Sequence, residues 1–307
     1  MPRLAFVFPG QGAQYPGMGK DFADNFTEAA HIFKVADDLA GYKLSSICFE
    51  GPKEKLNQTE FAQPALLVTS LAIMEVLKKQ GIVPLMMAGL SLGEYTALVA
   101  AQALTLEEAL PLVQTRARLM QEAVPAGKGA MAAVLGAEEE IVKQACKQAE
   151  GIVEIANYNC PGQVVISGEA NAVKQAGDIL KNAGVRVKML AVSVPSHSPL
   201  MEETATKLKP YLEHTEWQES LVDVVSNVNA RENSAAAFSD VLARQLFCPV
   251  LWEQSIRYMM DKVDYFVEVG PGTTLSGLIR RIDRNRILGN VNDIESMQKV
   301  IKEVKSR

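Results

Sequence analysis

A serine at position 91 stands in a spacing that is typical of enzymatic nucleophiles. It lies between Gly89 and Gly93 in the stretch "AGLSLGEYTALVA" (88–100), which matches the pattern G-x-S-x-G. An apolar run precedes the pattern and a helix-like run follows it. In this strand–turn–helix setting, small neighbours let the serine adopt a strained conformation, and the helix N-terminus favours an oxyanion. The alternative is a Gly-Ser turn without chemistry.

A serine nucleophile needs a base, and the chain has three histidines. His31 lies in a helix-like stretch and His214 near a helix C-terminus, so surface or structural roles explain both. His197 lies in the loop "VSVPSHSPLM", between a strand-like and a helix-like segment, where functional groups gather. A following helix N-terminus favours the neutral imidazole that a base requires. The sequence therefore predicts His197 as the base, with a hydrogen-bonded loop histidine as the alternative; no Asp or Glu between the two residues stands out as a third member.

One arginine lies on the apolar face of a predicted helix. Leu112, Val113, Leu119 and Met120 are three or four residues from Arg116, so its guanidinium emerges among apolar side chains. Arg118 faces Gln114 and Glu122 instead and looks solvated. A guanidinium on a buried face needs an anionic partner. That partner is either a structural carboxylate such as Glu94 or the carboxylate of a substrate held by a bidentate fork.

The Gly-rich stretch "FPGQGAQYPGMGK" (8–20) does not match a nucleotide-binding motif. Gly10 and Gly12 fit G-x-G-x-x-G, but position 15 is Tyr, and Met18 stands where the P-loop requires Lys. Spacing alone favours a tight strand-to-helix loop. The other interpretation is a loop whose backbone amides face a developing negative charge.

The pattern of apolar residues predicts an α/β fold with a mostly parallel sheet. Thr105 and Glu108 form a capping box that begins the helix carrying Arg116. The strand-like segments are 3–8, 84–88 and the start of 265–282, and the helix-like segments are 63–80, 92–103 and 106–123.

The order of strand-like and helix-like segments changes near residue 124, which indicates an inserted subdomain. Strand-like pieces at 130–135, 152–156 with 163–167, and 185–194 alternate with helix-like pieces at 137–149 and 170–183. This βαββαβ order is typical of a ferredoxin-like α+β unit. We therefore expect a large α/β subdomain over 1–124 and 197–307, and a small α+β subdomain over 125–196.

The composition restricts the class of protein. The 307 residues carry a net charge of −5, which argues against a general nucleic-acid binder. The cysteines are too scattered for a zinc or redox motif and fit a reducing compartment: Cys48, Cys146, Cys160 and Cys248. The N-terminal apolar run is too short for a signal peptide, and no apolar run is expected to reach transmembrane length. We expect a cytoplasmic protein.

Eight motifs in order identify a resemblance over nearly the whole chain. They resemble the bacterial malonyl-CoA:acyl-carrier-protein transacylases and, more distantly, the acyltransferase domains of polyketide synthases. The motifs are "FVFPGQGAQ" (6–14), "GLSLGEYTALVA" (89–100), "TRARLMQEAV" (115–124), "GAMAAVLG" (129–136), "NYNCPGQVVISG" (157–168), "SVPSHSPLM" (193–201), "RQLFCPVLW" (244–252) and "EVGPG" (268–272).

The resemblance implies a hydrolase-like α/β core with a ferredoxin-like insert. It implies that Ser91 is acylated, that His197 is its base, and that Arg116 clamps the malonyl carboxylate. Transfer is then a ping-pong cycle from malonyl-CoA to the holo carrier protein, in fatty-acid or polyketide synthesis, with no metal and no redox cofactor. The resemblance fits malonyl and methylmalonyl groups alike.

The resemblance also implies supporting roles around this centre. The backbone amides of Gln11 and Leu92 form the oxyanion hole, and the backbone carbonyl of Gln245 orients the base in place of a carboxylate. Asn157 and Asn159 line the cleft for coenzyme A and pantetheine.

The sequence departs from the family at Leu90, where the family usually has histidine. That histidine is not the base, so the expected mechanism survives, but the acyl pocket loses a polar wall. Carrier proteins are typically acidic, so we expect a basic docking patch on this protein. We also expect the enzyme to act as a monomer. We expect no membrane partner and no nucleic-acid partner. The candidates are Arg280, Arg281, Arg284 and Arg286, for which a solvated helix end is the alternative.

Two other functions use the same residues differently. A hydrolase that clears acyl groups from carrier proteins would keep Ser91 and His197 but would not need Arg116. A non-catalytic scaffold that binds carrier proteins would not need the serine or the histidine.

Overall fold

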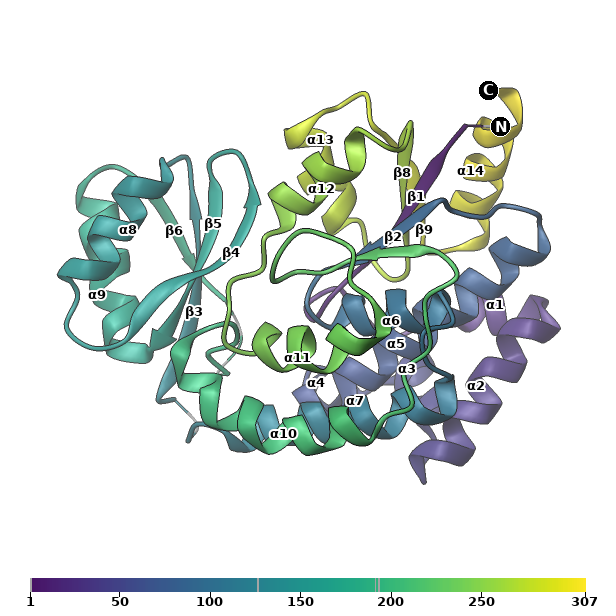
Figure 1. Ribbon diagram of the computed structural model, residues 1–307, viewed down its shortest axis with the longest axis horizontal. Helices are drawn as coiled ribbons and strands as arrows, with labels where there is room; N and C mark the ends of the chain where they lie inside the picture. Colours follow the sequence, from purple (N-terminus) through teal and green to yellow (C-terminus); the bar gives the residue numbers. More distant parts are fainter. Residues whose placement is uncertain (1, 126, 191, 193) are drawn as a thin grey trace.

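The computed structural model describes residues 2–125, 127–190, 192 and 194–307, and the chain folds around two separate sheets (Figure 1). Sheet A has parallel strands in the order β7-β2-β1-β8-β9. They are β1 (Leu4–Phe8), β2 (Met86–Gly89), β7 (Asp223–Val225), β8 (Tyr265–Val269) and β9 (Ile287–Val291). The predicted α/β fold is confirmed.

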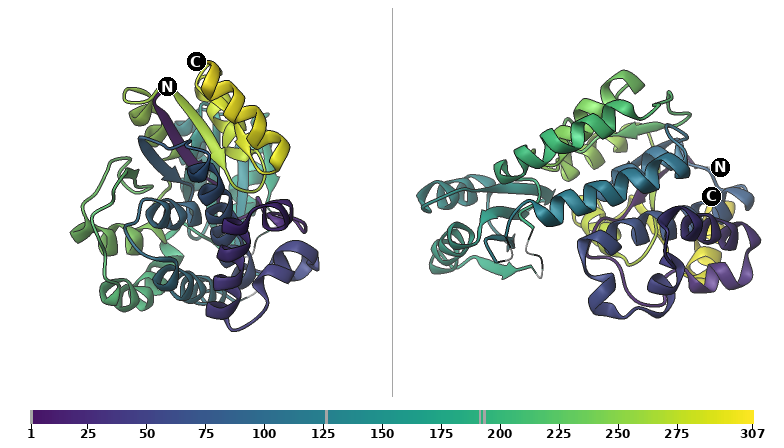
Figure 2. Two further views of the ribbon diagram at one scale, coloured as in Figure 1. Left: turned by 90° about the vertical axis from the view of Figure 1, so that its right-hand side faces the viewer. Right: turned by 90° about the horizontal axis from the view of Figure 1, so that it is seen from below.

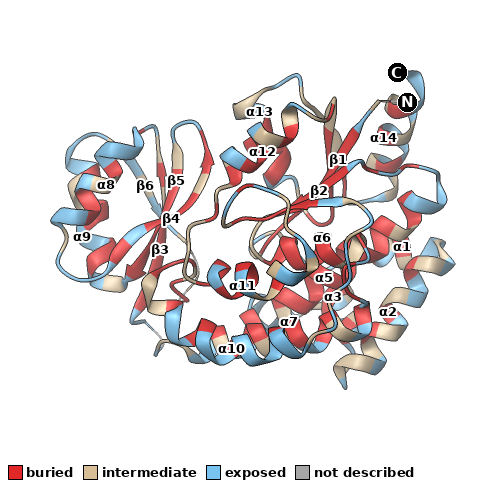
Figure 3. Ribbon diagram, in the orientation of Figure 1, coloured by how far each residue is buried: buried red, intermediate tan, exposed pale blue. Residues whose placement is uncertain are grey.

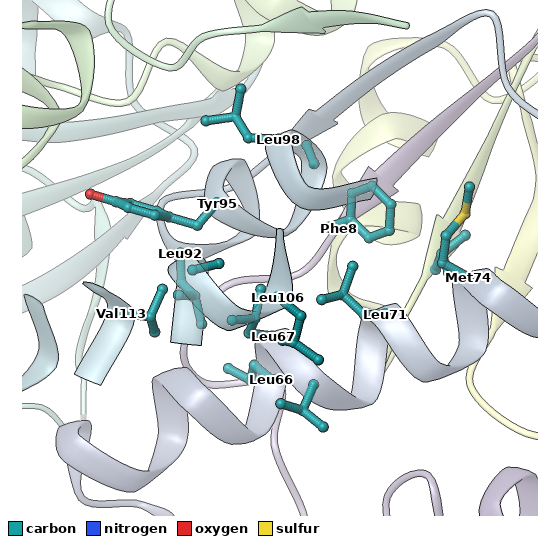
Figure 4. Close-up of a cluster of buried hydrophobic side chains, with 14 of the residues drawn as sticks. Phe8, Leu66, Leu67, Leu71, Met74, Leu92, Tyr95, Leu98, Leu106 and Val113 are labelled. Carbon is teal, nitrogen blue, oxygen red and sulfur yellow. The ribbon is translucent and has the colours of Figure 1, made fainter. Parts of the chain in front are cut away.

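Both faces of sheet A are buried, because alternate side chains of β1 enter two different apolar clusters. Leu4, Phe6 and Phe8 join the cluster formed with α5 (Thr59–Lys79), α6 (Leu92–Ala100) and α7 (Leu106–Glu122). Ala5 and Val7 join the cluster formed with α12 (Trp252–Met260) and α13 (Thr274–Ile282). Figure 4 shows Leu71 of α5 beside Phe8. Helices on both faces explain why the strands are continuous apolar runs.

The helix α5 contradicts one expectation from the sequence. It is long and apolar enough to cross a membrane by length and composition, although no run was expected to reach that length. Its most apolar window is 83% buried inside the protein. Figure 3 shows α5 largely in the colour of buried residues. The helix starts at Thr59 rather than at residue 63 and contains Pro64 in its second turn. Its composition therefore reflects its central place in the core.

Sheet B is antiparallel, with the strand order β4-β5-β3-β6. The chain order β3-α8-β4-β5-α9-β6 confirms the ferredoxin-like prediction. Helices α8 and α9 cover its outer face, and its other face is turned toward the rest of the molecule (Figures 1 and 2). The elements are β3 (Gly129–Leu135), α8 (Glu139–Gln148), β4 (Val153–Cys160), β5 (Gln163–Glu169), α9 (Ala170–Asn182) and β6 (Arg186–Met189).

Two strands of sheet B differ from their predicted lengths. β4 continues to Cys160 instead of ending at residue 156, because Asn157, Tyr158 and Cys160 also pair with β5; Asn157 forms an additional bridge with Val250 outside the sheet. β6 ends at Met189 instead of residue 194; Ala191 and Ser193, near the end of the predicted strand, lie outside the described residues.

The remaining helices surround sheet A. The predicted capping box of α7 is present, with Thr105 accepting a hydrogen bond from the amide of Glu108. The others are α1 (Lys20–Asn25), α2 (Thr27–Ala40), α3 (Leu44–Glu50), α4 (Lys53–Leu56), the 3₁₀ helix Pro199–Met201, α10 (Glu202–His214), α11 (Ala235–Gln245) and α14 (Ile294–Ser306).

The topology brings three loops to one edge of sheet A. Gln11 follows β1, Ser91 follows β2, and Asn227 follows β7. Because these strands are parallel neighbours, their carboxyl ends meet at the same edge, where ligands of open α/β sheets bind.

Candidate active site

Ser91 lies on a strained turn between β2 and α6. Its φ of 54° and ψ of −106° are unfavourable for a residue with a side chain. The turn needs glycine on both sides: a Cβ at Gly89 would lie 1.8 Å from the carbonyl carbon of Gly93, and one at Gly93 would lie 2.1 Å from the oxygen of Phe8. This tight packing holds the serine at the end of the strand, the arrangement known as a nucleophile elbow.

The close approach at Gly93 gives a stability prediction. We expect Gly93→Ala to lower the free energy of unfolding by about 3 kcal/mol or more, because the backbone of β1 cannot move away from the new methyl group. Gly277→Ala is the matched control: it also lies in a helix, has nothing within 4 Å of the new Cβ, and should stabilise by about 0.5–1 kcal/mol. Urea denaturation measures both values. Equal stability of the two variants would contradict the tight elbow.

The structure brings His197 to the serine. Its Nε2 lies 2.9 Å from Ser91 Oγ, and its Nδ1 lies 2.7 Å from the backbone oxygen of Gln245. The carbonyl oxygen only accepts, so Nδ1 carries the proton and the neutral imidazole presents Nε2 as an acceptor to the serine hydroxyl. A backbone carbonyl thus occupies the position of the missing third residue. The other two histidines, His31 and His214, are exposed and distant from this site.

The environment of His197 favours its neutral form. Burial, and then the positive charge of Arg116, lower its pKa from 6.5 to about 4. The imidazole therefore stays unprotonated through the neutral range and is able to accept a proton from Ser91.

This lowered pKa gives a prediction for the pH dependence of Ser91 reactivity. Only neutral His197 accepts the proton, so reactivity is present above the folded pKa and is lost as the pH falls through it. We expect the second-order rate of Ser91 labelling by a fluorophosphonate to be constant from about pH 8 to about pH 5 and to be half-lost near pH 4. A midpoint near 6.5, the ordinary value for histidine, would contradict the buried and charge-coupled base.

Arg116 is fully buried next to the serine, and all of its hydrogen-bond partners are neutral. Nη1 donates to Oε1 of Gln63 at 2.6 Å, and Nη2 donates to Oε1 of Gln245 at 2.9 Å and to Ser91 Oγ at 3.2 Å. Within the described residues no carboxylate forms an ion pair with it, and Glu94 reaches it only through the side chain of Gln245. Burial lowers the pKa of Arg116. A buried guanidinium without an ion-pair partner favours the binding of an anionic ligand.

Sequence reasoning missed two positioning residues, Gln63 and Asn227, and a second role of Gln245, that of its side chain. Gln63 and the side chain of Gln245 hold Arg116 from two sides. Asn227 accepts a hydrogen bond from the Ser91 amide at 2.7 Å and donates to the Gly89 carbonyl at 2.7 Å, which fixes the elbow. The position of Asn227, two residues after the end of β7, was the only signal for it in the sequence, and Gln63 lies within an apolar run.

A cavity of about 260 Å³ opens beside Ser91, between the edge of sheet A and the open face of sheet B. The amides of Gln11 and Leu92 donate no hydrogen bond to any acceptor in the described part of the chain, which leaves them available. Leu90 forms an apolar wall. The predicted site residues that line the cavity are Gln11, Leu90, Ser91, Leu92, Arg116, Asn157, Asn159 and His197.

The four predicted docking arginines are not equivalent. Arg280, Arg281 and Arg284 are exposed on or just after α13. Arg281 donates to Gln163, which lines the cavity, so this helix lies at the cavity mouth. Arg286 instead donates to the carbonyls of Val263 and Asp264 and is engaged in the fold. No cluster of His, Cys, Asp or Glu suited to a metal ion occurs among the described residues.

A parallel sheet that carries a serine on a strained turn beside a buried histidine defines the α/β-hydrolase-like class of serine enzymes. Within this class, the chain belongs to the acyl transferase family, whose domain matches residues 5–305.

Curated relatives and solved structures agree with this assignment. The chain is 45% identical to the malonyl CoA-acyl carrier protein transacylase of Bacillus subtilis, over 99% of this chain and 98% of that protein. A crystal structure of an acyl carrier protein S-malonyltransferase from Vibrio cholerae has a TM-score of 0.94 and 41% identity, covering 97% of this chain and 99% of that one. A malonyl-transacylase in complex with its type II polyketide acyl-carrier protein has a TM-score of 0.95 and 43% identity, covering 98% and 99%.

Proposed function

We propose that this protein transfers the malonyl group from malonyl-CoA to the phosphopantetheine thiol of acyl carrier protein. The observation that carries the proposal is the buried Arg116 guanidinium, which lies 3.2 Å from Ser91 Oγ and has no carboxylate partner among the described residues. A malonyl group supplies that carboxylate two bonds from the carbon that the serine attacks. The names of the relatives agree with this substrate and this acceptor.

In the first half-reaction, Ser91 Oγ attacks the thioester carbonyl while His197 Nε2 accepts its proton. The amides of Gln11 and Leu92 stabilise the tetrahedral oxyanion; the loss of one such donor typically costs about 10²–10³ in rate. The intermediate then collapses, the carbon–sulfur bond breaks, and coenzyme A leaves with the proton that His197 returns. The product is a malonyl-Ser91 ester.

In the second half-reaction, the carrier protein's thiol transfers its proton to His197 and attacks the ester carbonyl. The same amides stabilise the second oxyanion. Ser91 leaves as the carbon–oxygen bond breaks and takes the proton back from His197. The backbone carbonyl of Gln245 keeps the imidazole in one tautomer through both steps. Asn157 and Asn159 face the pantetheine arm that both substrates share.

The carrier protein docks on α13 in this proposal, through the exposed Arg280, Arg281 and Arg284 at the cavity mouth. We expect the double variant Arg280→Glu/Arg284→Glu to raise the KM for holo carrier protein by about tenfold. Acylation by malonyl-CoA should remain within about twofold, because Ser91 is untouched. Lys34→Glu/Lys79→Glu, at exposed lysines of α2 and α5 on the other face of sheet A, changes the net charge by the same amount and is the control. Equal effects of the two double variants on the KM would contradict docking at α13.

We further propose that the enzyme acts as a monomer, since one chain supplies every residue of the mechanism. Residues 125–196 form a small subdomain between the two parts of the large one, 1–124 and 197–307. The free cysteines fit a reducing cytoplasm.

A chase experiment tests the function and separates it from its rivals. The enzyme is incubated with malonyl-CoA, freed of excess substrate, and divided between buffer, apo carrier protein and holo carrier protein. Rapid loss of the malonyl adduct with the holo form alone, with malonyl gained by the carrier, is the expected result. Equal loss in all three would indicate a hydrolase, and no adduct with no released coenzyme A would indicate a scaffold.

A further inference from the structure

The side chain of Gln245 connects Arg116 on α7 with Ser91 and Glu94 at the start of α6. Gln245, the last residue of α11, is fully buried. Its Nε2 donates to the Ser91 carbonyl at 3.0 Å and to Glu94 Oε2 at 2.7 Å, and its Oε1 accepts from Arg116 Nη2 at 2.9 Å. The carboxamide therefore lies between the nucleophile's backbone and the guanidinium.

The Gln245 carboxamide has a donor end, Nε2, and an acceptor end, Oε1. The hydrogen-bonding groups around it determine which end faces Arg116. Glu94 Oε2 accepts from Gln245 Nε2 and also from the backbone amide of Asn227 at 3.1 Å. The Ser91 carbonyl can only accept. A flipped carboxamide would place Oε1 against these two acceptors and Nε2 against the guanidinium, so both ends would be unsatisfied in a buried site.

Glu94 is well placed for this role. It lies three residues after Ser91, in the first turn of α6, so its side chain folds back beside the serine's own carbonyl. It is fully buried and does not line the cavity, so it has no contact with a substrate. No step of the mechanism above uses it.

We propose that Glu94 is a positioning residue for the malonyl clamp: it fixes the orientation of the Gln245 carboxamide, and Gln245 in turn directs Arg116 Nη2 toward the acyl carboxylate. This inference rests on the proposed function. It predicts that Glu94 affects the choice of acyl group more than the reactivity of the serine–histidine pair, because neither Ser91 Oγ nor His197 hydrogen-bonds the Gln245 side chain.

The test compares Glu94→Leu with Glu94→Gln. Leucine removes the acceptor, whereas glutamine keeps an oxygen that accepts from Gln245 Nε2. For Glu94→Leu we expect the KM for malonyl-CoA to rise about tenfold and the preference for malonyl-CoA over acetyl-CoA to fall about tenfold. Labelling of Ser91 by an uncharged fluorophosphonate should fall much less than malonylation, because the contact between Ser91 Oγ and His197 does not include Glu94. Glu94→Gln should restore most of the malonyl preference.

A double-mutant cycle keeps the test decisive if Glu94→Leu is poorly folded. Gln245→Leu retains the backbone carbonyl that orients His197 and should show the same loss of malonyl preference. In Glu94→Leu/Gln245→Leu, two apolar side chains face each other, and Glu94→Leu should cause no further loss because it acts through Gln245.

Several results would overturn the inference: an unchanged malonyl preference in Glu94→Leu, equal losses of malonylation and fluorophosphonate labelling, no recovery in Glu94→Gln, or additive losses in the cycle. Failure of the proposed function has a different signature, because the wild type itself would then take up no malonyl group.

Discussion

Arg116→Ala is expected to lower kcat/KM for malonyl-CoA by about 10²- to 10³-fold and to remove most of the preference for malonyl-CoA over acetyl-CoA. The wild-type guanidinium is buried with neutral partners only, so a substrate without a carboxylate leaves it unpaired, which is costly. The alanine variant has no such charge to satisfy, so acetyl-CoA loses its disadvantage. Steady-state kinetics with both thioesters measure the ratio.

Arg118→Ala is the matched control for this experiment. Arg118 lies on the same helix, but it is exposed and forms a surface ion pair with Glu122 at 3.4 Å. Such surface ion pairs contribute little to stability. In Arg118→Ala, kcat/KM for malonyl-CoA and the preference for malonyl-CoA over acetyl-CoA should therefore stay near the wild-type values. A malonyl preference that survives in Arg116→Ala would show that another group selects the acyl chain.

Ser91→Ala and His197→Ala are expected to lower kcat for malonyl transfer by about 10⁴-fold or more, with nearly the same loss in the double variant. The two side chains act as one unit at 2.9 Å, so removal of either removes the activated nucleophile. A single-turnover assay with malonyl-CoA and holo carrier protein measures the rates. His214→Ala, at an exposed histidine, should be fully active. Additive losses, or an active Ser91→Ala, would contradict a covalent mechanism through this serine.

The fold was largely predictable because its signals are local. The apolar runs of β1 and β2, the capping box of α7 and the βαββαβ order of sheet B each depend on neighbouring residues. The strained turn at Ser91 was also visible, since Gly89 and Gly93 mark it in the sequence. The errors concern contacts that a single segment does not reveal: pairing with β5 lengthens β4, and burial inside the protein explains the apolar composition of α5.

Sequence reasoning named the three side chains that the structure brings together, Ser91, His197 and Arg116, but not the side chains that hold them in place. Arg116 was expected on the apolar face of its helix, but the sequence left its partner open between Glu94 and a substrate. The structure shows why: the glutamine between Arg116 and Glu94 lies 129 residues from the arginine in the chain. Gln63 and Asn227 depend on similar long-range contacts, which no spacing rule reveals.

The central claim is that Ser91 carries the malonyl group, and intact-mass spectrometry of the protein after incubation with malonyl-CoA tests it most directly. We expect one malonyl adduct on the wild type, located on the peptide that contains Ser91, and none on Ser91→Ala. We also expect little adduct from acetyl-CoA on the wild type and a clear one on Arg116→Ala. An adduct that persists in Ser91→Ala, or a wild type that releases coenzyme A without ever holding an acyl group, would contradict this claim.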